Sequence, residues 1–168
     1  YIGQDCDLSA FNPVAAEAVR WTRDQLSEED REWLRDLRYV KYVDHFSIVH
    51  GTMDSPRHWG YVQDVNDAKL SFNYQNTVLC FHGHTHVSVV FVEDGVDIEH
   101  GTFTNLKLEP GNRYFINVGS VGQPRDGYLP ASYCCLFFPS DAADEVLGLD
   151  ICCHVFIKIL LTNTHISY

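Results

Sequence analysis

The chain has 168 residues, of which 45% are hydrophobic and 13% aromatic, so it is long enough and apolar enough to fold as a globular domain. Its net charge is −11, and a surface of that sign repels phosphate backbones, which argues against a nucleic-acid polymer as a partner. No apolar run approaches the roughly 18 residues of a membrane span, and no secretory signal is visible.

The first part of the chain is predicted to be helical. "FNPVAAEAVRWTRDQL" begins at Asn12, a good N-cap, followed by Pro13 at the first helical position, and its apolar residues recur at helical spacing. "SEEDREWLRDL" predicts a second, short helix that is capped by Ser27 and has three acidic residues in its first turn. The residues expected on its buried face are Trp33, Leu34 and Leu37.

After residue 38 the hydrophobic pattern changes to one typical of strands. "RYVKYVDHFSIVHG" predicts two short strands around a turn at Asp44–His45, and the second strand leads directly into His50. A weak helical pattern covers 62–75. Further strands are expected at 77–81, 87–92, 114–118 and 132–138, with a hairpin turn at Asp94–Gly95. This alternation of helices and strands predicts an α/β fold.

The composition changes at the end of the chain. Residues 151–168 contain no acidic residue and a single lysine, although the chain as a whole is strongly acidic. Two interpretations stay open: a last buried strand with a frayed end, or a tail that does not belong to the domain. We therefore assign 1–150 to the domain and 151–168 to an atypical C-terminal tail.

Histidines follow two of the predicted strands. The stretch "VLCFHGHTHVSVVF" breaks at Gly83 and then carries His84 and His86, and His50 likewise follows an apolar strand. If the strand continues past Gly83, residues i and i+2 point to the same face and suit one metal ion or two neighbouring ions. Ligand residues collect at the carboxyl ends of strands in α/β sheets. The alternative is that these histidines are ordinary polar residues at strand ends.

Other metal-binding patterns do not fit. H-E-x-x-H is absent, the H-x-E and P-C-x-x-C pattern of zinc deaminases is absent, and no acidic residue follows H-T-H at the spacing of a cupin. A mononuclear zinc hydrolase built on His50, His84 and His86 is left open, because three histidines are a known catalytic zinc set.

Three blocks of the sequence resemble one family. "GHTH" resembles the last metal-binding block of the calcineurin-like metallophosphoesterases, and "IVHG" resembles the block that supplies a single histidine. "INVGSVGQPRDG", residues 116–127, is similar to the N-P-G-S-V-G-Q-P-R-D-G stretch of the small bacterial and archaeal members, often labelled diadenosine-tetraphosphatase-like. Val118 replaces the usual proline. The order and spacing of the blocks agree over roughly residues 8–133.

This resemblance implies a two-sheet α/β sandwich with αββα layers. It also implies hydrolysis of a phosphomonoester, phosphodiester or dinucleoside polyphosphate by a hydroxide activated between two divalent cations (Mn, Fe, Zn, Ni or Mg). His50 and His84 would bind one cation and His86 the other. The residues implied for the site loop and substrate are Asn117, Gly119, Ser120 and Arg125. We expect Asp54 and His82 to be bystanders, and His58 to be one unless it reaches the substrate.

The family also has D-x-H, G-D-x-x-D and G-N-H-D/E blocks, which supply carboxylate and further ligands, and the chain contains none of them. We therefore expect the C-terminal part of a phosphoesterase domain, with its N-terminal strands missing, partial metal occupancy and impaired activity on its own. The alternative is a catalytically inactive metal-binding or interaction module on the same scaffold.

The expected partner is a small phosphate ester, rather than a nucleic-acid polymer or a membrane. The six cysteines include no C-x-x-C pair, which predicts reduced thiols and a cytoplasmic protein. The sequence carries no signal of oligomeric state.

Overall fold

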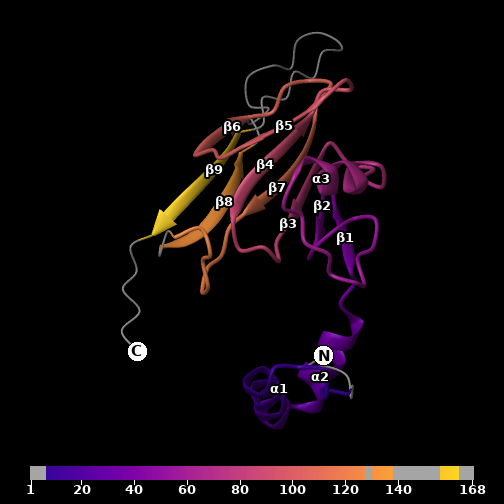
Figure 1. Ribbon diagram of the computed structural model, residues 1–168, viewed down its shortest axis with the longest axis vertical. Coiled ribbons are helices and arrows are strands. Elements are labelled where there is room, and N and C mark those ends of the chain that lie inside the picture. Colours follow the sequence, from indigo (N-terminus) through magenta and orange to yellow (C-terminus); the bar gives the residue numbers. More distant parts are fainter. Residues whose placement is uncertain (1–6, 128–129, 138–155, 163–168) are drawn as a thin grey trace, which may run out of the picture. The chain divides into compact units, whose positions relative to one another are not determined.

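The computed structural model describes residues 7–127, 130–137 and 156–162 (Figure 1). The chain divides into two compact units, Tyr1–Arg38 and Tyr39–Tyr168. The helices are α1 (Pro13–Gln25), α2 (Glu28–Asp36) and α3 (Val65–Phe72). Among the described residues, no helix has the length and apolar character needed to cross a bilayer.

The first unit contains α1 and α2, and both predicted caps are confirmed. The Asn12 side chain accepts a hydrogen bond from the backbone of Val14. Ser27 and Asp30 form a reciprocal capping box. The predicted buried face of α2 is wrong, because no α2 residue is buried and the side chain of Trp33 is 64% exposed. Leu37, which follows the helix, is 52% exposed and Leu34 is only half-buried. Helical spacing marks an apolar side, but burial also needs a neighbouring element to cover it.

The second unit is built on a six-stranded mixed sheet. Its strands, in spatial order, are β1 (Val40–Val43), β2 (Phe46–Val49), β3 (Leu79–His82), β7 (Arg113–Val118), β4 (Ser88–Glu93) and β5 (Ile98–Gly101). β2, β3 and β7 are parallel neighbours, whereas the β1–β2, β4–β7 and β4–β5 pairs are antiparallel. The first two predicted strands form the β1–β2 hairpin, and Asp44 in its turn has a φ of 41°.

A smaller sheet contains β6 (Asn105–Lys107), β9 (Phe156–Thr162) and β8 (Ala131–Phe137) in that order. Both pairs are antiparallel, so β9 is the middle strand. β9 lies within the segment that the sequence marked as an atypical tail. The predicted boundary at 150/151 lies outside the described residues.

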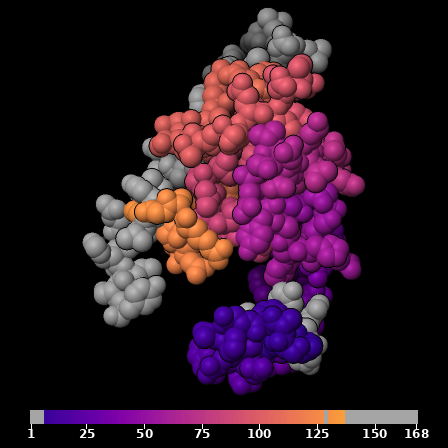
Figure 2. Space-filling model, in the orientation of Figure 1, coloured from indigo at the N-terminus to yellow at the C-terminus, as the bar shows by residue number. Residues whose placement is uncertain are grey.

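Two apolar clusters hold the layers of the second unit together. On one face of the large sheet, Phe72 of α3 packs in a cluster with Cys80, Phe91 and Phe115. On the other face, Tyr114 and its neighbours pack against residues of β6 and β8. The described layers are therefore a helix, a six-stranded sheet and a three-stranded sheet, which confirms the predicted two-sheet α/β sandwich (Figure 1). Figure 2 shows the residues of α3 and of the large sheet as one continuous surface in the same orientation.

Candidate metal centre

The carboxyl ends of β2, β3 and β7 meet at one edge of the large sheet, because these strands are parallel neighbours. His50 follows β2 directly, and Gly83 follows β3. The backbone N–H of Gly83 donates to the carbonyl of His50 over 2.9 Å, which joins the two strand ends. The strand-end histidines of the sequence are thus brought to one place.

β3 stops at His82, so the strand does not continue through the H-T-H stretch. His84 and His86 lie in the β3–β4 loop, with left-handed φ values of 69° and 59°. Between them, the backbone N–H of Thr85 donates to the carbonyl of Gly83 over 2.8 Å. The orientation of both histidines therefore comes from a tight loop, and not from the alternation of a strand.

His50 and His84 form a close pair. His50 Nε2 lies 3.0 Å from His84 Nδ1. This is the distance of a hydrogen bond. Two nitrogens that bind one zinc ion at ~2.0–2.1 Å are separated by about 2.9–3.4 Å, so the same spacing fits a pair of ligands to one ion. Burial lowers the pKa of both rings, and the nearby charge of His86 lowers each further. A lowered pKa favours the neutral imidazole, which is the form that binds metals.

His86 has a defined tautomer. Its Nδ1 lies 2.7 Å from the carbonyl of Gln123, and since a carbonyl only accepts, Nδ1 carries the proton. When the ring is neutral, Nε2 then offers its lone pair to a ligand, an arrangement common among metal-binding histidines. Among the residues that the structure describes, no group of three or more His, Cys, Asp or Glu side chains is arranged to hold a metal ion.

Asn117, at the end of β7, supports this loop from below. Its side chain is fully buried, and its Nδ2 donates to the Gly83 carbonyl over 2.9 Å and to Thr85 Oγ1 over 2.8 Å. Its Oδ1 accepts from the backbone N–H of Gly119 over 2.9 Å. One side chain thus ties the end of β7 to both sides of His84.

The segment that follows β7 lies beside His86. Ser120 Oγ accepts from the backbone of Gln123 over 3.0 Å, and the backbone N–H of Arg125 donates to the His86 carbonyl over 3.1 Å. The exposed Arg125 also contributes to lowering the pKa of His84, after burial, His50 and His86. The four predicted loop residues therefore all lie at or next to the histidine loop.

The three expected bystanders differ in position. His82 is buried, its ring stacks on Phe115 with centroids 4.1 Å apart, and burial lowers its pKa to about 3. It faces the core and not the site. Among the described residues, neither Asp54 nor His58 makes a side-chain hydrogen bond or ring contact with the three histidines.

Sequence reasoning missed several neighbours of the histidines. The ring of Trp59 lies 5.1 Å from that of His50, and the ring of Tyr61 lies 4.1 Å from that of His84. Thr85 and the Gln123 carbonyl were missed as well. Thr85 and Gln123 lie inside recognised blocks of the sequence, and that position is the signal that could have found them. Trp59 and Tyr61 lie in a loop without periodicity, and no sequence signal marked them.

Comparison with known proteins gives consistent matches. The sequence matches the model of the calcineurin-like phosphoesterase superfamily domain over residues 6–140. It is 32% identical to an uncharacterized protein of Methanocaldococcus jannaschii over 149 residues, covering 85% of this chain and 58% of that protein. The fold is similar to the crystal structure of a metallophosphoesterase from Sphaerobacter thermophilus, with a TM-score of 0.66 and 34% identity, covering 94% of this chain and 60% of that one. The chain therefore spans less than two thirds of either protein.

Proposed function

The chain belongs to the calcineurin-like phosphoesterase superfamily. We therefore propose that its function is the metal-dependent hydrolysis of phosphate esters. The substrate class is a small phosphomonoester, phosphodiester or dinucleoside polyphosphate, and neither a nucleic-acid polymer nor a membrane is a partner. The observation that carries this proposal is the His50–His84 pair, whose ring nitrogens lie 3.0 Å apart at the ends of parallel strands. We keep the prediction that the protein works in the cytoplasm.

The residues present fit the role of metal ligands. His50 and His84 offer neutral imidazole nitrogens to one cation, and His86 offers Nε2, which we assign to a second cation. Imidazole suits Zn, Fe or Ni, and Mn and Mg complete the candidate set. A divalent cation held here would supply Lewis acidity toward a phosphoryl oxygen and a positive field in an acidic protein.

The other residues bind and orient. Asn117 fixes the loop that carries His84 and His86, so the ligand nitrogens need little reorganisation. Arg125 adds a positive charge near His84 that attracts a substrate phosphate. Gly119 and Ser120 shape the segment whose Gln123 carbonyl accepts a hydrogen bond from His86 Nδ1.

The test is hydrolysis of bis(p-nitrophenyl) phosphate with Mn²⁺ by the natural polypeptide that carries this chain. His84→Ala should lower kcat/KM at least a hundredfold, whereas His100→Ala, which removes an exposed histidine of β5, should leave it within twofold. Metal binding without turnover would favour the inactive metal-binding module instead. Equal rates in the wild type and His84→Ala would refute the proposal.

A further inference from the structure

The loop between β2 and α3 holds a bulky residue in a strained conformation. Trp59 has a φ of 50°, a left-handed value that is rare for a large side chain. The loop is locked there by close packing, because a Cβ added to Gly51 would lie only 2.6 Å from the Gly60 carbonyl and 3.2 Å from the Trp59 backbone. Such strain is retained where the surrounding structure enforces it, and it concentrates at functional sites.

The strained loop places two aromatic rings against the candidate metal centre. The Trp59 ring lies 5.1 Å from the ring of His50 and 6.5 Å from that of His84. Tyr61 lies almost parallel to His84, with centroids 4.1 Å apart and an angle of 32°. These two residues form what we call the aromatic wall.

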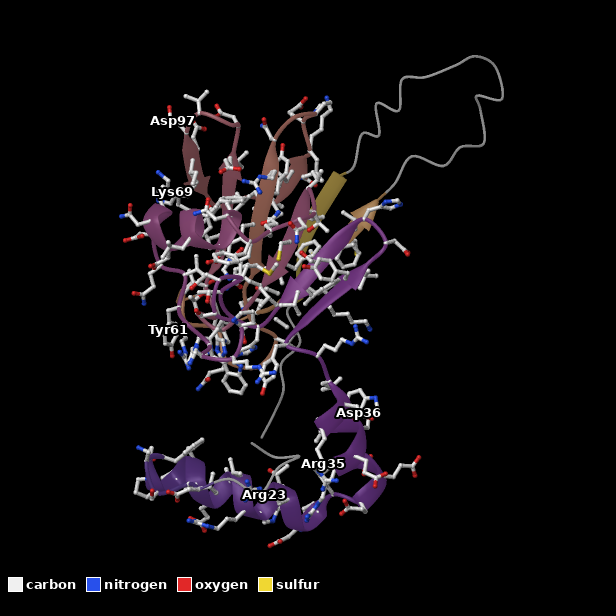
Figure 3. The ribbon with its side chains drawn as sticks, turned by 90° about the vertical axis from the view of Figure 1, so that its right-hand side faces the viewer. Arg23, Arg35, Asp36, Tyr61, Lys69 and Asp97 are labelled. Atoms are coloured by element: carbon white, nitrogen blue, oxygen red, sulfur yellow. The ribbon has the colours of Figure 1, made fainter. Side chains whose placement is uncertain are left out.

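Both members of the aromatic wall remain accessible. Trp59 is partly exposed and Tyr61 is 48% exposed. Figure 3 shows Tyr61 at the end of the second unit opposite to Asp97, which lies in the β4–β5 turn. A molecule whose phosphate reaches His50 and His84 would therefore have the aromatic wall beside it.

We propose that the aromatic wall binds a planar aromatic group carried by the phosphoester substrate. This inference rests on the proposed function and adds the substrate's second group to it. Tyrosine and tryptophan rings stack on flat π systems in offset or edge-on arrangements and tolerate many ring types. An aliphatic phosphoester has no group to place there. The aromatic group could be a nucleobase joined through a sugar, or an aryl group esterified directly to the phosphate.

The experiment compares matched ligands by titration calorimetry on the Mn²⁺-loaded protein. Adenosine monophosphate and ribose 5-phosphate share a sugar phosphate and differ in the base. Phenyl phosphate and cyclohexyl phosphate differ only in aromaticity. We expect the aromatic member of at least one pair to bind at least fivefold more tightly. Preference in the first pair identifies a nucleobase, and preference in the second identifies a direct aryl ester.

The variants separate stacking from packing. In Trp59→Leu and Tyr61→Leu, the ratio of affinities within the preferred pair should fall below twofold. Trp21→Leu and Tyr74→Leu change exposed aromatic residues and should keep the ratio. If the aromatic wall only supports the histidines, both members of a pair weaken together and the ratio stays constant, which would overturn the inference.

The outcomes also distinguish the inference from the proposed function. Metal-dependent binding of all four compounds with equal affinity within each pair would overturn the inference and leave the proposed function standing. Failure of all four to bind would overturn both.

Discussion

Asn117 makes three hydrogen bonds from a position with no solvent exposure. Two are donated to the loop that carries His84 and His86, and one is accepted from Gly119. A buried amide of this kind is costly to disturb, because each lost bond leaves a buried polar partner unsatisfied. At the scale of single residues, the geometry of the candidate site therefore depends on an amide that would not itself touch a metal.

Replacing Asn117 with aspartate keeps the size and removes both donors. We expect Asn117→Asp to lower the free energy of unfolding by about 2–4 kcal/mol and to weaken Zn²⁺ binding by roughly tenfold. Chemical denaturation and metal titration measure the two effects. Asn66→Asp makes the same change at an exposed position of α3 and should alter neither quantity measurably. Equal behaviour of the two variants would contradict the positioning role.

Much of the site at this scale could be predicted from the sequence. The structure brings together the three histidines and the four loop residues named from their blocks, because each block follows a strand of the same sheet. Their role as ligands stays a prediction. The pairing of His50 with His84 and the tautomer of His86 depend on φ values and carbonyl positions that a sequence pattern does not encode. The contacts of Trp59 depend on a strained loop.

At the scale of elements, short loops after the parallel strands orient the site. Gly119 follows β7 with a φ of 97°, and a Cβ there would lie 3.1 Å from the Ser132 side chain. The backbone N–H of Gly119 donates a hydrogen bond to Asn117 Oδ1. Glycine is required at this position for both its conformation and its lack of a side chain.

A methyl group at Gly119 should therefore destabilise the fold. We expect Gly119→Ala to cost about 1–3 kcal/mol of folding free energy, because it combines backbone strain with a close contact. Thermal and denaturant unfolding measure this. Gly101→Ala is the matched control, since Gly101 has no left-handed φ and no atom within 4 Å of an added Cβ. A loss of stability in the control that matches the loss in Gly119→Ala would contradict the explanation.

The elements were predicted unevenly. The caps of α1 and α2, the β1–β2 hairpin and the strands that became β3, β4, β7 and β8 followed from periodicity and turn residues. β5 and β6 were not predicted, because both are short and lie in a stretch without clear alternation. The strand expected at 77–81 forms at Leu79–His82, because its ladder partners in β2 and β7 set its ends.

At the scale of the whole molecule, the sheet order explains how residues from distant blocks share one site. Parallel pairing of β2, β3 and β7 puts three carboxyl ends at one edge. The chain carries 23 acidic and 12 basic residues, so its overall field disfavours a phosphate ligand. Arg125 adds a positive charge near His84, and cations bound at the histidines would add more. The pairing within the smaller sheet could not be predicted, because β9 lies between β6 and β8 and comes from the segment for which a last strand was one of two open interpretations.

Metal binding by the paired histidines tests the central claim most directly. The metal-free chain is titrated with Zn²⁺ and with Mn²⁺, and bound metal is confirmed by elemental analysis. We predict that His50→Ala and His84→Ala each weaken binding at least tenfold, whereas His100→Ala binds as the wild type does. Unchanged metal content and affinity in both His50→Ala and His84→Ala would contradict the account.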